Sequence, residues 1–364
     1  MISEKISSQF LLDEKRLDGS YFLNEYAIHS RKIEKHRDKC VPLHEIASVF
    51  NPPIFKRQFC QKTERAVQYC QSSDVTNALE GSNVYINKKQ AEKVGAIVKE
   101  NQILVTGFGT IGNTRLVNSL SDGIAYANNV CRIETNPDKL HGFVYAFLSS
   151  KYGHAQLNKN ASGSVVRYIE APGIKKTLIP LFPEPKQQQI HNLIMEAIEL
   201  RSESNQLLSS SINYFKKYTT DYIHGRFVSR KININQLQDS NKRLDANYAI
   251  ANQSIYKSFI KSSNASISID EIASGIFIGP RTKRNFIKKG IPFLSTSSMQ
   301  KANPTKADKY LNKKLALSYM VESGWILTTR SGSLGDTILV PDCINEYAVS
   351  EDAIRIVVKE NGSF

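Results

Sequence analysis

The most regular hydrophobic pattern of the chain lies between residues 186 and 222, where positions at alternating spacings of three and four are apolar except at Ser204 and Ser211, which weaken the pattern. This spacing places them along one face of a helix and is typical of a coiled-coil seam. Prolines at 180, 183 and 185 precede the segment and Gly225 follows it, so both ends carry helix-boundary signals. We predict one long spacer helix within 184–228; a helix buried in a domain core is the alternative. The predicted partner-helix seam consists of Ile190, Leu193, Ala197, Leu200, Leu207, Tyr214 and Tyr218.

On both sides of this segment the pattern changes to short β-rich runs separated by turns and short helical stretches. Residues 102–106, 325–329 and 353–358 have the composition of strands, and residues 142–149 that of a helix. This predicts an α+β fold in which a coiled-coil-type helix separates two similar mixed α/β domains. The predicted boundaries are 1–183, 184–228 and 229–364.

An internal repeat supports this division. The sequence ILVTGFGTIGNTRLV at 103–117 aligns without gaps to ILTTRSGSLGDTILV at 326–340, with identity at eight of fifteen positions. RLDGSY at 16–21 likewise matches RLDANY at 243–248, and the offset between the copies drifts only from 227 to 223. The small drift predicts two copies of one domain. The counterpart of Ile133 is Ile356, close to residue 364, so we expect the second copy to be incomplete.

Two short motifs suggest chemistry, and the repeat argues against both. Residues 107–112 spell GxGxxG after a strand, as in a dinucleotide site, but a strand-like run follows and Arg330 replaces the first glycine in the second copy. A tight hairpin is the preferred interpretation. Asn51-Pro52-Pro53 is similar to the NPP core of adenine-N6 methyltransferases, although Ile54 stands where those enzymes have an aromatic residue. A rigid loop is favoured there, and a self-contained DNA adenine methyltransferase is kept as an alternative.

Catalytic and metal sites find no support in the residue pattern. All seven histidines precede residue 225, which excludes a duplicated histidine site, and the five cysteines contain no CxxC pair. We therefore predict no catalytic residue, no metal, and reduced thiols that are mostly buried. The chain has no run of eighteen apolar residues and no signal-peptide pattern at its start, so we expect no membrane contact and a cytoplasmic location.

The net charge of the chain instead indicates a polyanionic binding partner. Lys and Arg number 48 against 34 Asp and Glu, which gives a formal net charge of +14. Basic groups recur at corresponding places in the two copies, where lysine would hold phosphates and arginine would read bases; plain solvated charge is the alternative. The predicted double-stranded DNA contacts are Lys56, Arg57, Lys88, Lys89, Phe108, Arg281, Lys283, Arg284, Lys313, Lys314 and Arg330.

The repeated ILVTGFGTIGNT turn, together with SGSVVRYIEAPGIKKTLIPLFPEPKQQQIHNLI at 162–194, resembles the specificity (S) subunit of type I restriction-modification systems. The resemblance implies two target recognition domains, each reading half of a bipartite DNA site. It also implies that the long helix is a spacer and a dock for methyltransferase (M) subunits, which carry the S-adenosylmethionine, while a restriction/motor (R) subunit joins through the complex. It implies that this chain binds no cofactor. A homodimer through the helix, and a truncated competitor that sequesters methyltransferase subunits, are the alternatives.

Overall fold

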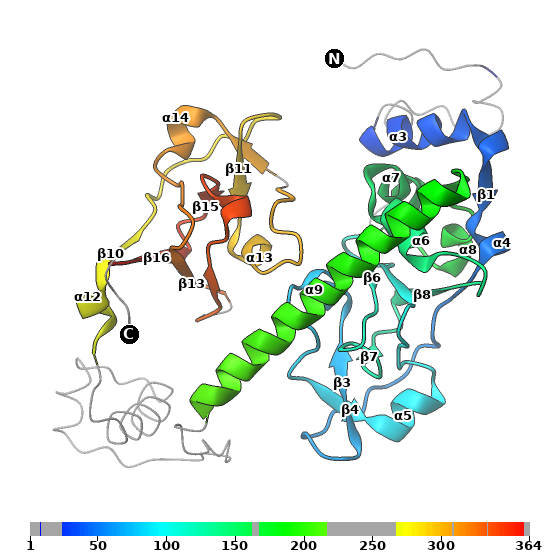
Figure 1. The fold of residues 1–364 in the computed structure, drawn as a ribbon, viewed down its shortest axis with the longest axis horizontal. Helices are drawn as coiled ribbons and strands as arrows, with labels where there is room; N and C mark the ends of the chain where they lie inside the picture. Colours follow the sequence, from blue (N-terminus) through cyan, green and yellow to red (C-terminus); the bar gives the residue numbers. More distant parts are fainter. Residues whose placement is uncertain are drawn as a thin grey trace. The chain divides into compact units, whose positions relative to one another are not determined.

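The computed structural model describes residue 8 and residues 24–161, 167–216, 267–307, 309–332 and 334–359. The chain divides into two compact units, Met1–Glu203 and Ser204–Phe364, which run from blue to green and from green to red in Figure 1. Among the described residues, no helix is both long enough and apolar enough to cross a membrane. Each unit combines helices with antiparallel and mixed sheets, which confirms the predicted α+β class.

The first unit is built on a four-stranded antiparallel sheet with the order β2-β8-β5-β6. Its strands are β2 (Ala47–Phe50), β8 (Val130–Thr135), β5 (Ile103–Thr106) and β6 (Thr114–Leu116). A three-stranded sheet has the order β4-β3-β7, and β1 pairs with β9. These strands are β4 (Tyr85–Asn87), β3 (Ala66–Cys70), β7 (Ala125–Tyr126), β1 (Cys40–Pro42) and β9 (Leu178–Pro180). Because β2 and β5 both pair antiparallel with β8, they end at the same sheet edge.

Helices cover one face of the four-stranded sheet. Phe143, Phe147 and Leu157 pack against Val49 and Ile133 in one buried cluster, and burial of this apolar surface stabilises the layer. The helical elements of the first unit are α3 (Glu25–Glu34), η1 (Arg37–Lys39), α4 (Leu43–Ile46), η2 (Ser72–Thr76), α5 (Lys88–Lys93), α6 (His141–Ser149), α7 (Lys151–Lys159), α8 (Ala171–Ile174) and the start of α9 (Glu184–Lys216).

The second unit repeats the strand order, with β10-β16-β13-β14 in one sheet and β12-β11-β15 in the other. Its strands are β10 (Ala273–Ile278), β16 (Ala353–Val358), β13 (Ile326–Thr329), β14 (Thr337–Leu339), β12 (Lys309–Leu311), β11 (Ile291–Leu294) and β15 (Ala348–Val349). Its helical elements are α12 (Ile269–Ile272), α13 (Thr296–Met299), α14 (Lys313–Ala316) and η3 (Asp342–Ile344).

The pairing registers confirm the repeat strand by strand. Ile103 pairs with Leu116 in the first unit and Ile326 with Leu339 in the second, so both partners are displaced by the same 223 positions. A β-bulge between Ala273 and Gly275 inserts one residue into β10. This insertion raises the offset from 226 to 227 along that strand, against the overall decrease to 223.

A buried arginine joins the two sheets of each unit. Arg132 is 1% exposed, and its guanidinium donates hydrogen bonds to the backbone carbonyls of Ala96, Tyr126, Ala127 and Val130. Burial lowers the pKa of Arg132 to about 10, so the side chain is still charged at neutral pH. In the second unit, Arg355 is equally buried and donates to four carbonyls that each stand 223 positions later: those of Tyr319, Val349, Ser350 and Ala353.

The long helix is observed as α9, from Glu184 to Lys216 (Figure 1), and the remainder of the predicted 184–228 segment lies outside the described residues. At about 1.5 Å per residue its 33 residues extend about 50 Å. Ile198 is 8% exposed and packs, with Ile190 and Ile194, on the first unit's core.

Most residues of the predicted seam lie on a different side of α9 from the row that packs on the core. Leu193, Leu200, Leu207 and Tyr214 are 59 to 62% exposed. Ala197 is exposed too. Ile190, which the sequence assigned to the seam, is partly buried and packs against the core of the first unit. Tyr218 lies outside the described residues.

The cysteines only partly follow expectation. Cys70 and Cys131 are buried, whereas Cys60 and Cys343 are exposed, so the prediction of mostly buried thiols was wrong for these two. No disulfide is present between the five, all of which lie in the described ranges.

Candidate nucleic-acid interface

The predicted contact residues of each unit come from two loops that follow strands of the four-stranded sheet and from a helix start that follows a strand of the three-stranded sheet. In the first unit, the loop after β2 carries Lys56 and Arg57, and the loop after β5 carries Phe108; both leave from the same sheet edge. In the second unit, the loops after β10 and β13 carry the counterparts of these residues. The repeated topology therefore places the predicted contacts in equivalent loops and helix starts of two separate units.

The loop that follows β2 in the first unit and β10 in the second carries an arginine that stacks on an aromatic ring in both copies. The guanidinium carbon of Arg57 lies 5.7 Å from the ring centre of Tyr69, and Phe59 meets the same ring edge to face at 6.1 Å. In the second unit, Arg284 lies 5.1 Å from the ring centre of Phe293, which also contacts Phe286. At the offset of 227 the two loops align as KRQF at 56–59 and KRNF at 283–286. Stacking on an aromatic ring orients an arginine while leaving its edge available.

The two stacked arginines differ in charge compensation. Arg284 Nη1 donates to Glu351 Oε2 at 2.9 Å. At the offset of 223, the residue in place of Glu351 in the first unit is Asn128, which carries no charge. The positive charge of Arg57 is therefore not compensated from that position, whereas that of Arg284 is. Arg281 and Lys283 of the same loop are exposed.

Each unit presents a lysine pair at the start of a short helix. Lys88 and Lys89 begin α5, and Lys313 and Lys314 begin α14; all four are exposed. The side chains of Asn87 and Asn312 cap these helices by accepting hydrogen bonds from the backbone N–H groups of Gln90 and Leu315. Positive charge in the first turn opposes the helix dipole, so the pairs do not serve helix stability.

Gln90 joins the loop and the lysine pair in the first unit. Its Nε2 donates to the carbonyl of Lys56 at 2.7 Å, and its Oε1 accepts from the N–H of Gln58 at 3.0 Å. Lys56 and Arg57 are thereby held beside the start of α5, although more than thirty residues separate them in sequence. In the second unit, the N–H of Ile287 donates to the carbonyl of Tyr310 at 2.9 Å, equivalent to the bond from Cys60 to Tyr85.

The loop after β5 carries Phe108 in the first unit. Phe108 stacks on Tyr168 with ring centres 5.4 Å apart, and both rings are partly exposed at 37% and 36%. Gly107 is required here because a Cβ atom would lie 2.5 Å from the carbonyl oxygen of Ile169. In the second unit Arg330 stands at the position equivalent to Gly107, and its backbone N–H donates to the carbonyl of Asp352.

The glycine motif forms a hairpin turn between β5 and β6, as predicted. Gly109 and Gly112 have positive φ angles, as do Gly332 and Gly335 at the equivalent positions. In each copy the first threonine of the turn fixes the loop, because Thr106 and Thr329 Oγ1 accept hydrogen bonds from the N–H groups of Asn113 and Asp336. A strand follows the turn, so the helix N-terminus of a dinucleotide site is absent there.

Asn51 of the NPP sequence has a structural role in the first unit. Its Nδ2 donates to the carbonyl of Asn128, and its Oδ1 accepts from the N–H of Ala171 at the start of α8. Both ends of the carboxamide are engaged with backbone, so it is not free to hold a target adenine. This supports the rigid-loop interpretation.

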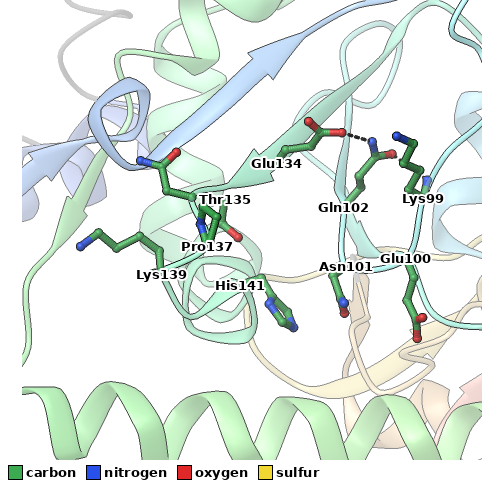
Figure 2. Close-up of a pocket in the computed structure, with 10 residues that line it drawn as sticks. Lys99, Glu100, Asn101, Gln102, Glu134, Thr135, Pro137, Lys139 and His141 are labelled. Carbon is green, nitrogen blue, oxygen red and sulfur yellow. Dashed lines mark hydrogen bonds between the residues drawn. The ribbon is translucent and has the colours of Figure 1, made fainter.

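A hollow of about 330 Å³ lies at the opposite edge of the four-stranded sheet (Figure 2). It opens where β5 begins and β8 ends, and Gln102 donates to Glu134 in its wall. Its other lining residues are Lys99, Glu100, Asn101, Thr135, Asn136, Pro137, Lys139 and His141. Because loops 51–65 and 107–113 leave from the other edge, this hollow is separate from the candidate interface. Within the described residues, no group of three or more histidine, cysteine or acidic side chains is arranged to hold a metal ion.

Two histidines fasten α9 to α6. The rings of His141 and His191 meet edge to face at 4.8 Å, and His191 Nδ1 accepts a hydrogen bond from the N–H of Gly142. Burial lowers the pKa of both imidazoles, and the neighbouring His191 lowers that of His141 further.

This contact predicts acid sensitivity of the first unit. The folded state keeps both imidazoles neutral, while the unfolded chain takes up protons near pH 6.5. The free energy of unfolding should therefore fall as pH decreases from 7.5 through about 6.5 and further toward the folded pKa values. Urea unfolding at pH 7.5 and 5.5 should show a smaller difference for H191Q than for the unaltered chain. H36Q, at an exposed position, is the control; an equal difference in all three would contradict this account.

Several residues of the candidate interface were not identified from the sequence. Phe59 and Phe286 follow the basic pairs by two positions, and the offset of 227 would have aligned them. The capping residues Asn87 and Asn312 were visible in the repeat but were not recognised as caps. Tyr168 carried no signal, because its contact with Phe108 joins segments sixty residues apart.

Comparison with known families gives one match. Residues 39–214 match the family model described as the type I restriction modification DNA specificity domain. None of the curated proteins compared with the chain matches it.

Three solved structures are similar at low identity. The S subunit of a type I restriction-modification system from M. genitalium is 15% identical, covers 88% of this chain and 72% of its own, and has a TM-score of 0.35. The HsdS subunit from Thermoanaerobacter tengcongensis is 13% identical, covers 88% and 75%, and has a TM-score of 0.32. The type IIG restriction endonuclease BpuSI is 9% identical, covers 53% and 30%, and has a TM-score of 0.38. These values are too low to compare individual residues.

Proposed function

The chain belongs, over residues 39–214, to the type I restriction-modification DNA specificity family, and we propose that it reads a bipartite DNA site with one half assigned to each unit. The family is a DNA-recognition component of a restriction-modification complex. The finer assignment rests on the two copies of one recognition unit in this chain. Each unit would place its loops against one half-site.

The observation that carries the proposal is the repeated basic loop with its arginine stacked on an aromatic ring. Arg57 over Tyr69 and Arg284 over Phe293 are equivalent in register, and a lysine pair lies at a helix start in both units. Exposed lysines suit phosphate contacts, and an oriented guanidinium suits the acceptor pair of guanine. The formal net charge of +14 supports association with a polyanion.

The long helix is proposed as the spacer and as a dock for methyltransferase (M) subunits. Leu193, Leu200, Leu207 and Tyr214 follow one another at seven-residue spacing and are largely exposed, as a helical partner surface would be. A restriction (R) subunit would join through this complex, which would work in the cytoplasm. A second copy of the chain, pairing through the same row, is the competing occupant.

In this proposal the partner subunits, rather than this chain, carry out the chemical reactions. S-adenosylmethionine would be bound by the M subunit, and the hydrogen bonds of Asn51 to backbone support a chain without its own transfer site. Methyl transfer to DNA by the purified chain alone would overturn this assignment.

The test uses Arg57 in the complex of this chain with its methyltransferase subunits. R57A should relax discrimination at one base pair by about 1–3 kcal/mol, and R57K should retain most of the affinity but lose the same discrimination. R284A is the matched control, and a smaller effect is expected because Arg284 is bonded to Glu351. Binding to a set of single-base variants of the site measures this. Unchanged discrimination in R57A and R57K would remove Arg57 from base reading.

A further inference from the structure

The side chain of Gln90 holds the chain on both sides of Arg57. Its Nε2 donates to the carbonyl of Lys56 at 2.7 Å, and its Oε1 accepts from the N–H of Gln58 at 3.0 Å. These two groups belong to the two peptide units that flank Arg57, so one carboxamide fixes the backbone from which the guanidinium extends. The carbonyl of Gln58 also accepts from the N–H of Asn87 at 3.0 Å. The loop is therefore fastened to the start of α5 at the position of its arginine.

The helix that carries Gln90 does not need this side chain in order to form. The cap of α5 is made by the backbone N–H of Gln90, which donates to Asn87 Oδ1 at 3.1 Å. In the second unit α14 has the same asparagine cap and carries Leu315 at the equivalent position. Leucine and glutamine also have similar helix propensities. The contribution of the Gln90 side chain therefore lies in its contacts with the loop.

The two units orient their equivalent arginines by different means. Leu315 stands 225 positions after Gln90, and its side chain packs against the apolar cluster around Phe293. A leucine has no hydrogen-bonding group with which to hold the loop. Arg284 is instead bonded through its own guanidinium, which donates to Glu351 at 2.9 Å. The contacts of Gln90 use backbone groups, so they leave the donors of the Arg57 guanidinium for other partners.

We propose that Gln90 is a positioning residue for base reading by Arg57. This role rests on the proposed function, in which the guanidinium meets the acceptor pair of guanine. Bidentate contact requires both the distance and the orientation of the guanidinium to be set. The ring centre of Tyr69 lies 5.7 Å from the guanidinium carbon and supports one face, while Gln90 fixes the backbone. Because α5 also carries Lys88, one helix would hold the phosphate contact and the base contact in a fixed relation.

The experiment measures DNA binding by Q90L in the complex with methyltransferase subunits, on the site, its single-base variants and non-specific DNA. Discrimination at the base pair read by Arg57 should fall about fivefold, because each lost hydrogen bond is exposed and of modest strength. Affinity for non-specific DNA should change by less than about twofold, because Lys88 and Lys89 remain. Discrimination in the half-site assigned to the second unit is the internal control and should be unchanged.

Two further variants separate positioning from a general structural role. Q90M keeps the length of glutamine without its amide and should behave as Q90L does. If Gln90 acts through Arg57, Q90L/R57A should discriminate no worse than R57A alone.

Unchanged discrimination in both Q90L and Q90M, while R57A relaxes it, would overturn the role of Gln90 and leave the proposed function intact. An equal loss of specific and non-specific affinity, or a further loss of discrimination in Q90L/R57A, would also overturn it, because Gln90 would then act on the unit as a whole. If R57A itself left discrimination unchanged, base reading by Arg57 would fail and the role of Gln90 with it.

Discussion

Replacing Arg132 by methionine is expected to lower the free energy of unfolding of the first unit by about 3 kcal/mol. Methionine fills similar space but donates no hydrogen bond, so four carbonyls lose a donor inside the unit. The gain from no longer burying a charge opposes this loss, because burial already depresses the pKa of Arg132. We expect the loss to be larger, since the acceptors come from two chain segments, Ala96 and residues 126–130, that the guanidinium holds together.

The matched variant R355M should affect the second unit in the same way and leave the first unchanged. Urea unfolding followed by amide exchange in β5 and β13 separates the two units. A change below about 0.5 kcal/mol in both variants, the ordinary range for surface substitutions, would show that the buried arginines are not structural.

The second large effect is expected on DNA binding. The K88A/K89A variant should bind every DNA sequence more weakly, on the order of tenfold at physiological salt, and should reduce the salt slope of binding by about two. Adding K313A/K314A should reduce that slope by about four in total. The reason is that lysines hold phosphates, which carry no sequence information. Affinity measured from low to high salt, on specific and non-specific DNA, tests this.

The control is K99A/K139A, which removes the same number of lysines from the first unit. These two line the hollow at the opposite sheet edge (Figure 2), away from the candidate interface. They should change the salt slope much less than K88A/K89A. Equal slopes for the two double variants would mean that the net charge, rather than this surface, attracts DNA.

Local patterns predicted much of the fold. The repeat gave the correspondence of strands, and the strand-like run at 353–358 coincides with β16. The long helix was expected because a 3-4 spacing over many residues has few other interpretations. Its inward row was not recognised, because Ile190 fits the seam spacing and only the packing of the first unit decides which side it faces.

The hydrogen-bond partners of the buried arginines could not be predicted from the sequence. Arg132 and Arg355 recur within apolar strands, which was visible, but their acceptors are carbonyls on chain segments up to 36 residues away. A charged residue in a strand otherwise indicates an exposed face. The candidate contacts were identified by charge and recurrence, while the pairing of Arg284 with Glu351 arises from tertiary contact and had no local signal.

The most direct test of the central claim is the map of methylated adenines in DNA of cells that carry the methyltransferase subunit with and without this chain. The account predicts a split motif that appears only with the chain, and relaxed specificity at one base pair in one half of it in the R57A variant. Copurification of the chain with the methyltransferase subunit would confirm that the complex forms. A complex that forms while no methylation depends on the chain would contradict the account and favour a competitor that sequesters methyltransferase subunits.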